Sequence, residues 1–147
     1  MEELIKLLDH NLLYVGHEII SDTIYIHVIS EREEVICPFC GKPSSRVHSH
    51  YERSFQDLPV QGKKVIVILW NRKMFCDNPN CNHKTFAEPF DFLEHKAKKT
   101  IRLKNEIIKV ALTQSSMSAA EYLEGSVAKV RKSTICDYLK KNRNSSG

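Results

Sequence analysis

The chain has 147 residues, of which 41% are hydrophobic, and its formal net charge is +4 at pH 7. This composition supports a packed core and excludes global disorder. No apolar run approaches the roughly 18 residues of a membrane span, and Met1-Glu2-Glu3 carries acid where a secretory signal carries base. We therefore expect a cytoplasmic protein without membrane contact, in a reducing compartment where cysteines bind metals more often than they form disulfides.

The charge is unevenly distributed along the chain. Residues 1–36 carry two basic and eight acidic side chains, whereas residues 37–147 carry 20 basic and ten acidic ones. This asymmetry is typical of a protein whose main part binds a polyanion and whose N-terminal segment is acidic. An uneven solvated surface would give the same distribution, so charge alone does not establish nucleic-acid binding.

The N-terminal part predicts a helix followed by a β-hairpin. Leucine and isoleucine residues at helical spacing favour a short amphipathic helix over Glu2–Leu8. Two strands are expected over Tyr14–Ile20 and Thr23–Ile29, because apolar residues recur there between turn residues. Ser21-Asp22 supplies the turn that joins them.

Further strands are expected in the middle of the chain. Arg46–Phe55 favours one strand, which Asp57-Leu58-Pro59 should interrupt because proline donates no ladder hydrogen bond. The run Lys63–Trp70 is almost continuously apolar in its centre, which predicts a strand buried on both faces.

The last third of the chain has a helical pattern. Apolar residues on one face predict a helix over Thr100–Thr113. Ser118-Ala119-Ala120-Glu121 matches a capping box, and the short helix that it begins should end near Gly125. A final helix is expected over Lys132–Asn142, followed by a frayed tail. A basic stretch forms the entry to these helices: Lys96, Lys98, Lys99, Arg102 and Lys104.

Four cysteines have the spacing of a structural metal site. Two residues separate Cys37 from Cys40, and Gly41 permits the tight turn that lets both thiolates face one ion. Four residues separate Cys76 from Cys81, which is within the range of zinc sites. Four sulfur ligands favour tetrahedral zinc, with iron as the chemical rival. A closed site of this kind is structural rather than catalytic.

Other interpretations of the cysteines and histidines are weaker. Four reduced, buried thiols would need no metal, and a redox pair would need a βαβ context that the sequence lacks. His83 could compete with Cys81 as a ligand, whereas His48 and His50 share one face of a strand and are typical surface residues. Cys136 should behave as a small core side chain.

The segment Cys37–Glu88 resembles the N-terminal zinc finger of bacterial insertion-sequence transposases of the ISL-three family, and a weaker resemblance extends over roughly residues 12–140. The residues that carry it are Cys37-Pro-Phe-Cys40-Gly41, Val47-His48-Ser49, Arg53, Asp57-Leu58-Pro59, Gly62, Arg72-Lys73, Cys76, Cys81 and Lys84-Thr85-Phe86-Ala87-Glu88. In that family a helix-turn-helix and then an acidic-triad catalytic domain follow the finger. The chain stops at Gly147, so we expect no catalytic domain.

The resemblance implies an α+β fold: a small antiparallel β zinc ribbon with an N-terminal hairpin, followed by a helix-turn-helix-like unit. The expected units are 1–36 (helix and acidic hairpin), 37–93 (zinc ribbon), 94–142 (DNA-binding helices) and 143–147 (disordered tail). One departure affects the helices. Ten residues separate Leu123 from Thr134, where a tight helix-turn-helix has about five.

The implied partner is double-stranded DNA, specifically the terminal inverted repeats of an insertion sequence, with possible self-association and no small-molecule substrate. The start of the last helix offers candidates for base or phosphate contacts: Arg131, Lys132, Ser133, Thr134, Asp137 and Tyr138. Phosphate contacts are expected from Lys140 and Lys141 on that helix, and from Arg46, Arg53, Arg72 and Lys73 on the zinc module. An ordinary solvated surface is the alternative for each.

Two other functional classes compete with DNA binding. Zinc ribbons can dock subunits, and the acidic N-terminal segment would suit a basic partner, so an assembly module with little DNA affinity is the alternative. Strand-transfer chemistry would need carboxylates clustered around divalent ions. Asp57, Asp77, Asp91 and Asp137 lie on unlike elements, so we predict that the chain is not an enzyme.

Overall fold

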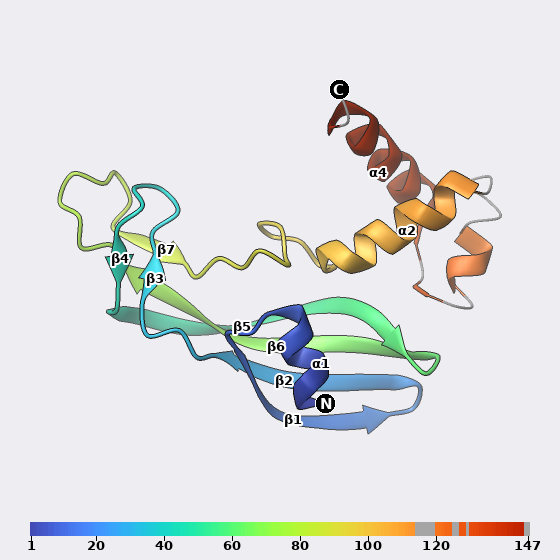
Figure 1. Cartoon of the computed structure of the whole chain (residues 1–147), viewed down its shortest axis with the longest axis horizontal. Helices are drawn as coiled ribbons and strands as arrows, with labels where there is room; N and C mark the ends of the chain where they lie inside the picture. Colours follow the sequence, from blue (N-terminus) through green and yellow to red (C-terminus); the bar gives the residue numbers. More distant parts are fainter. Residues whose placement is uncertain (114–119, 125–126, 129, 146–147) are drawn as a thin grey trace.

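A mixed β-sheet forms the body of the protein (Figure 1). The computed structural model describes residues 1–113, 120–124, 127–128 and 130–145, the last four of these by backbone alone. The elements are α1 (Glu2–Leu8), β1 (Leu12–Ile20), β2 (Thr23–Ser30), β3 (Val35–Ile36), β4 (Pro43–Ser44), β5 (Val47–Val60), β6 (Lys63–Phe75), β7 (Thr85–Ala87), α2 (Ile101–Thr113) and α4 (Lys132–Ser145). The expected α+β class is confirmed. Among the described residues no helix has the length and apolar character to cross a membrane.

The strand order of the main sheet is β1-β2-β6-β5, and β7 adds to the far end of β6. The hairpin β1–β2 forms as expected, but β2 pairs in parallel with β6, with Ile26 opposite Val67. The N-terminal hairpin and the strands between the cysteine pairs therefore share one sheet. The apolar faces of the two hairpins also share one core cluster.

One face of the sheet carries the main core. Every second residue of β6 from Val65 to Asn71 is buried, and Val65, Val67 and Leu69 share a core cluster with residues of α1 and the segment 90–93. The intervening Ile66 and Ile68 are only half-buried. The prediction that this strand is buried on both faces is therefore wrong, because none of the described elements packs over the second face.

Strand β5 is longer than the sequence predicted. It continues through Pro59 to Val60, and the register shifts between Asp57 and Val60. This irregularity accommodates the missing proline N–H, so the proline bends the strand instead of ending it. Gln61 and Gly62 then form a two-residue turn with positive φ angles of 50° and 76°, which suits the tight β5–β6 hairpin.

The helical unit lies at the end of the sheet opposite the short strands β3, β4 and β7 (Figure 1). Helix α2 begins after Thr100, whose Oγ1 accepts a hydrogen bond from the Leu103 N–H at 3.3 Å. Leu103 and Ile107 pack with Ile135 of α4 in a separate core. Leu112 of α2 is 64% exposed and lies outside this core.

The remaining helical predictions have mixed outcomes. Residues 120–124 are helical, and α4 extends to Ser145, beyond the expected end at Asn142. The capping serine Ser118 and the predicted stop Gly125 lie outside the described residues.

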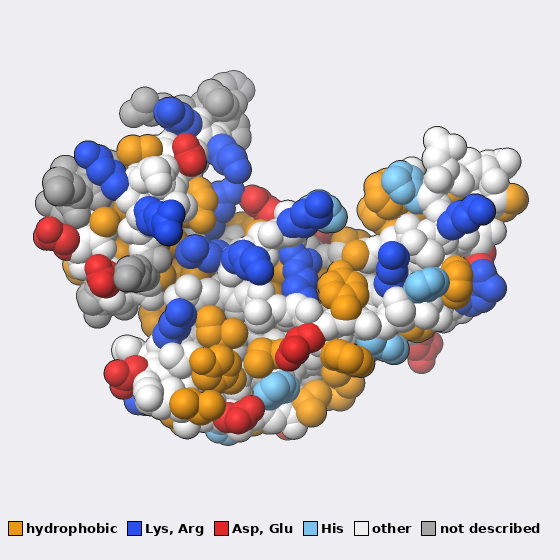
Figure 2. All heavy atoms as spheres, turned by 180° about the vertical axis from the view of Figure 1, so that it is seen from behind, with side chains coloured by type: hydrophobic (Ala, Val, Ile, Leu, Met, Phe, Trp, Pro, Cys, Tyr) orange, Lys and Arg blue, Asp and Glu red, His pale blue; other side chains and the backbone are white. Residues whose placement is uncertain are grey.

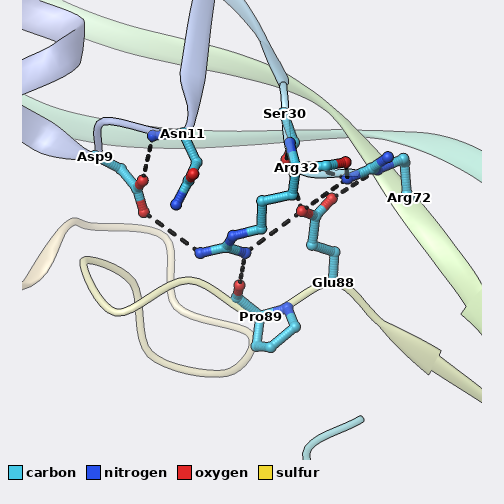
Figure 3. Close-up of polar contacts among 7 residues, drawn as sticks. All are labelled: Asp9, Asn11, Ser30, Arg32, Arg72, Glu88 and Pro89. Atoms are coloured by element: carbon cyan, nitrogen blue, oxygen red, sulfur yellow. Dashed lines mark hydrogen bonds and ion pairs between the residues drawn. The ribbon is translucent and has the colours of Figure 1, made fainter. Parts of the chain in front are cut away.

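Two buried carboxylates connect these parts. At one end, Glu88 accepts hydrogen bonds from Arg72 Nε (2.9 Å), Arg72 Nη2 (3.0 Å) and Ser30 Oγ (2.6 Å), as Figure 3 shows. Arg32 lies 3.4 Å from the same carboxylate and 3.7 Å from Asp9, at the end of α1. This Glu88 network joins β2, β6 and β7 to the N-terminal helix.

At the other end, Asp57 of β5 fixes the start of the helical unit. Its Oδ1 accepts hydrogen bonds from Thr100 Oγ1 and from Arg102 Nε, both at 2.8 Å, and its Oδ2 pairs with Arg102 Nη2. The hydrogen bond with Asp57 raises the pKa of the Arg102 guanidinium, which stays charged. The carboxylate therefore holds α2 against the sheet.

We expect Glu88→Gln to lower the free energy of unfolding by about 3 kcal/mol, because it leaves two largely buried guanidinium groups without a counter-charge. Urea unfolding of the zinc-loaded chain measures this loss. The matched control is Lys6→Gln, which removes an exposed ion pair with Glu31 and should cost less than about 1 kcal/mol. Equal losses in the two variants would contradict the structural role of the Glu88 network.

Candidate metal centre and basic surface

The first cysteine pair lies in a turn between β3 and β4. The Cys37 N–H donates to Lys42 O at 2.9 Å, and the Gly41 N–H donates to Cys37 O at 2.8 Å. Gly41 has φ = 78°, a left-handed conformation that glycine adopts without steric cost. The turn places both Cys37 and Cys40 on the side that faces the second pair.

The second pair lies between β6 and β7. The Cys76 N–H donates to Lys84 O at 2.8 Å, which closes the loop at its base. Asn78 shapes the tip, because its carbonyl accepts from the Cys81 N–H at 3.1 Å and its side chain accepts from the Asn80 N–H at 3.1 Å. The loop thereby presents Cys76 and Cys81 to the first turn.

The four cysteine sulfurs meet as the spacing predicted. All four Sγ atoms lie within 4.8 Å of one another, and those of Cys40 and Cys76 are 3.5 Å apart. A zinc ion with Zn–S bonds of about 2.3 Å needs sulfurs roughly 3.8 Å apart, so these residues fit a tetrahedral ion. Among the described residues no other group of three or more Cys, His, Asp or Glu side chains gathers in this way.

The thiols influence one another's protonation. The backbone N–H of Lys42 and the side chain of Asn78 lower the pKa of Cys40 to about 6. The Asn78 backbone N–H acts in the same direction on Cys76, but burial and the neighbouring sulfurs together raise the pKa of Cys76 to about 12. The surroundings thus favour the thiolate of Cys40 and oppose those of Cys76 and Cys81, and a bound divalent cation removes that conflict.

The other predicted cysteine and histidine positions lie outside this cluster. His83 stacks on Phe39 with ring centroids 3.5 Å apart, so its ring is engaged beside the site. His50 stacks on Trp70 at 5.7 Å. Cys136 is half-buried in α4, in the helical unit.

The fold and the site define a zinc-ribbon protein with a closed four-cysteine centre. Comparison with protein families then identifies the segment: residues 33–83, roughly a third of the chain, match the zinc-finger of transposase IS204/IS1001/IS1096/IS1165. This part of the chain is a zinc finger of the ISL-three transposase type, and it holds one structural zinc ion. No curated protein and no solved structure matches the chain.

The predicted DNA-contacting residues of α4 divide into two groups. Thr134 and Tyr138 are half-buried, and Tyr138 packs toward α2 with Lys104 Nζ 5.4 Å from its ring centroid. Burial raises the pKa of the Tyr138 hydroxyl. The other predicted residues are exposed; they are Arg131, just before the helix, and Lys132, Ser133, Asp137, Lys140 and Lys141 within it.

On the zinc module the four predicted phosphate ligands differ. Lys73 is exposed, and so is Arg46, although Arg46 Nε donates to Asp77 at 2.7 Å. Arg53 is half-buried and donates to backbone carbonyls of the segment after β7. Arg72 is half-buried, and its Nε and Nη2 both donate to the Glu88 carboxylate, so this edge of its guanidinium is engaged in the buried network.

A basic surface lies on the segment between β7 and α2 and on the first turn of α2, where the structure brings it beside α4. Lys98, Lys99 and Lys104 line a hollow of about 270 Å³ together with Lys141 of α4. Their lysine-rich run was visible in the sequence, but its position beside α4 depends on how the segment packs along β5. Figure 2 shows Lys and Arg side chains gathered over the middle of the molecule, between the helical unit and the zinc end.

We expect Cys40→Ser to abolish zinc binding and to unfold the ribbon around both cysteine turns, because structural zinc supplies roughly 10 kcal/mol of folding free energy in small modules. Metal stoichiometry of the purified chain and hydrogen exchange at residues 35–44 and 76–86 measure the two effects. Cys136→Ser, in the helical unit, should keep the ion. A Cys40→Ser chain that retained zinc and a protected ribbon would overturn the ligand assignment.

Proposed function

We propose that this chain is the DNA-binding part of a transposase, in which Cys37, Cys40, Cys76 and Cys81 ligate zinc and the exposed residues of α4 recognise a terminal inverted repeat. The observation that carries this proposal is the joining of an ISL-three-type zinc finger to helices with a basic exposed surface. The zinc stiffens the β platform, and the platform positions the helices through Asp57.

Helix α4 is the proposed reading element. The Ile135 N–H donates to Arg131 O at 3.1 Å, so Arg131 lies at the helix N-terminus, and Lys132 and Ser133 follow it on the surface. Residues at the N-terminal end of a recognition helix contact base edges, and basic residues farther along contact phosphates. In this proposal Lys140 and Lys141 of α4, and Arg46, Arg53 and Lys73 of the zinc module, contribute affinity without sequence choice.

A binding role fits the carboxylates better than catalysis. Asp57 is buried and held by Arg102, and Glu88 is buried and held by two arginines. Asp77 pairs with Arg46 beside the zinc site. Each of these carboxylates has a structural partner, whereas phosphoryl transfer by two metal ions needs carboxylates that converge on an open site.

We expect the chain to bind duplexes taken from the DNA flanking its own coding sequence more tightly than random duplexes. Arg131→Gln should weaken the flanking-repeat complex by about tenfold, in line with the roughly 1–3 kcal/mol of one base contact, and should affect random duplexes less. Fluorescence anisotropy with both duplexes measures this. Lys109→Gln, which removes the same charge from the exposed side of α2, is the control.

If Arg131→Gln weakens both complexes equally, its side chain does not read sequence. If the unmodified chain binds neither flanking duplex more tightly than a random duplex in the salt range tested, the proposed target is wrong.

The alternative function, an assembly module, is favoured by the bare second face of the sheet. Ile66 and Ile68 are half-buried there, Trp70 is 51% exposed and Ile20 is 57% exposed. An apolar face of this kind is typical of a contact surface, and a second copy of the chain would cover it. Molecular mass by light scattering, with and without DNA, separates the alternatives: a stable dimer that binds no DNA would favour assembly.

A further inference from the structure

Two adjoining hollows lie where β5, the segment 94–100 and helix α4 meet. They have volumes of about 270 and 470 Å³ and share His95, Ala97 and Lys98 in their linings. We call them together the linker hollow. Its basic lining consists of Arg53, Lys96, Lys98, Lys99, Lys104 and Lys141, and its acidic lining of Glu52 and Glu94.

The backbone of this segment is fixed along β5. The Gln56 N–H donates to Lys98 O at 2.8 Å, and the Thr100 N–H donates to Gln56 O at 2.9 Å. Arg53 Nη2 lies 3.2 Å from Glu94 O and 3.4 Å from the Ala97 carbonyl. The lysines of the hollow are therefore held on an ordered backbone, which limits the entropy lost when they bind a ligand.

Part of the positive charge is neutralised within the hollow and part is not. Lys104 Nζ donates to Glu94 at 2.8 Å, and this hydrogen bond lowers the pKa of the Glu94 carboxyl. Among the described residues, no carboxylate lies within ion-pair distance of Lys96, Lys98 or Lys99. Like charges gathered in a concave surface raise the local potential and attract an extended anion.

We propose that the linker hollow binds the phosphodiester backbone of duplex DNA and continues the contact surface of α4 across the sheet. The inference rests on the proposed function and adds a phosphate-binding site to it. Phosphate contacts made by lysines set position and affinity and carry no sequence information. The lysines of this site are Lys96, Lys98 and Lys99.

The lining favours a duplex over a single strand. Proteins that bind single strands present aromatic rings on which bases stack. Of the two tyrosines in the hollow, Tyr138 is half-buried beside Lys104, and Tyr51 is 39% exposed with its hydroxyl accepting a hydrogen bond from Asn71. The hollow thus offers six basic side chains and one exposed tyrosine ring, not a row of rings for successive bases, which suits a backbone whose bases are already paired.

The test compares two double variants of the full chain that lose the same charge. Lys98→Gln/Lys99→Gln removes two lysines of the hollow, and Lys63→Gln/Lys64→Gln removes two at the β5–β6 turn, outside the hollow. Binding to flanking-repeat, random and single-stranded DNA is measured by anisotropy over a series of salt concentrations. Zinc content and thermal melting confirm that each variant is folded.

We expect the slope of log affinity against log salt to decrease in magnitude by about 2 in the hollow variant, since each lost phosphate contact removes about 0.9. The turn variant should keep the slope of the unmodified chain. The ratio of affinities for flanking-repeat over random duplex should stay unchanged in the hollow variant, because its lysines contact phosphates.

Each other result has a defined meaning. The inference is overturned if the hollow variant keeps the salt slope of the unmodified chain, or if both double variants lose the same amount of slope. In either case the proposed function still holds if the chain prefers flanking-repeat duplexes. A collapse of the sequence preference, or tighter binding of single strands through the same lysines, also overturns the inference. A reduced slope without any preference for flanking repeats supports the hollow and refutes the proposed target. Absence of DNA binding refutes both.

Discussion

Four cysteine thiolates can share a site only around a cation, and the zinc end of this protein depends on that constraint. The turns that carry the cysteines have little else to hold them, since β3 and β4 are two residues long each and the local core is small: Val35, Met74 and Phe86 with Cys37. The metal joins the two turns across the 35 residues between Cys40 and Cys76, and so aligns the ends of β5 and β6.

Two arginine–carboxylate contacts carry this alignment to the rest of the chain. Glu88 follows the second cysteine turn and holds Arg32 and Arg72, which ties the zinc end to the N-terminal hairpin. Asp57 holds Arg102 at the other end of the long β5 strand. A buried carboxylate with arginine partners tolerates little displacement, because separation leaves charge without solvent. The zinc site, the sheet and the helices are therefore held in fixed positions relative to one another.

Local patterns predicted the fold well where neighbours in sequence decide the structure. The helix Glu2–Leu8, the β1–β2 hairpin and the four-cysteine cluster follow from periodicity, turn residues and ligand spacing. The parallel pairing of β2 with β6 did not follow, because β-pairing between distant segments leaves no local signal. The role of Arg72 was missed for a similar reason: its partner Glu88 is identified as buried only once the sheet has formed.

The same parallel pairing orders the events of folding. While the chain is being synthesised, the inner edge of β2 has no partner until β6, about forty residues later, has emerged. Closing so long a loop costs entropy before its contacts form, so this step is slow relative to the hairpins. An unpaired strand edge can recruit a second nascent chain. The surplus of acidic side chains in residues 1–36 opposes such recruitment, because like-charged segments repel one another.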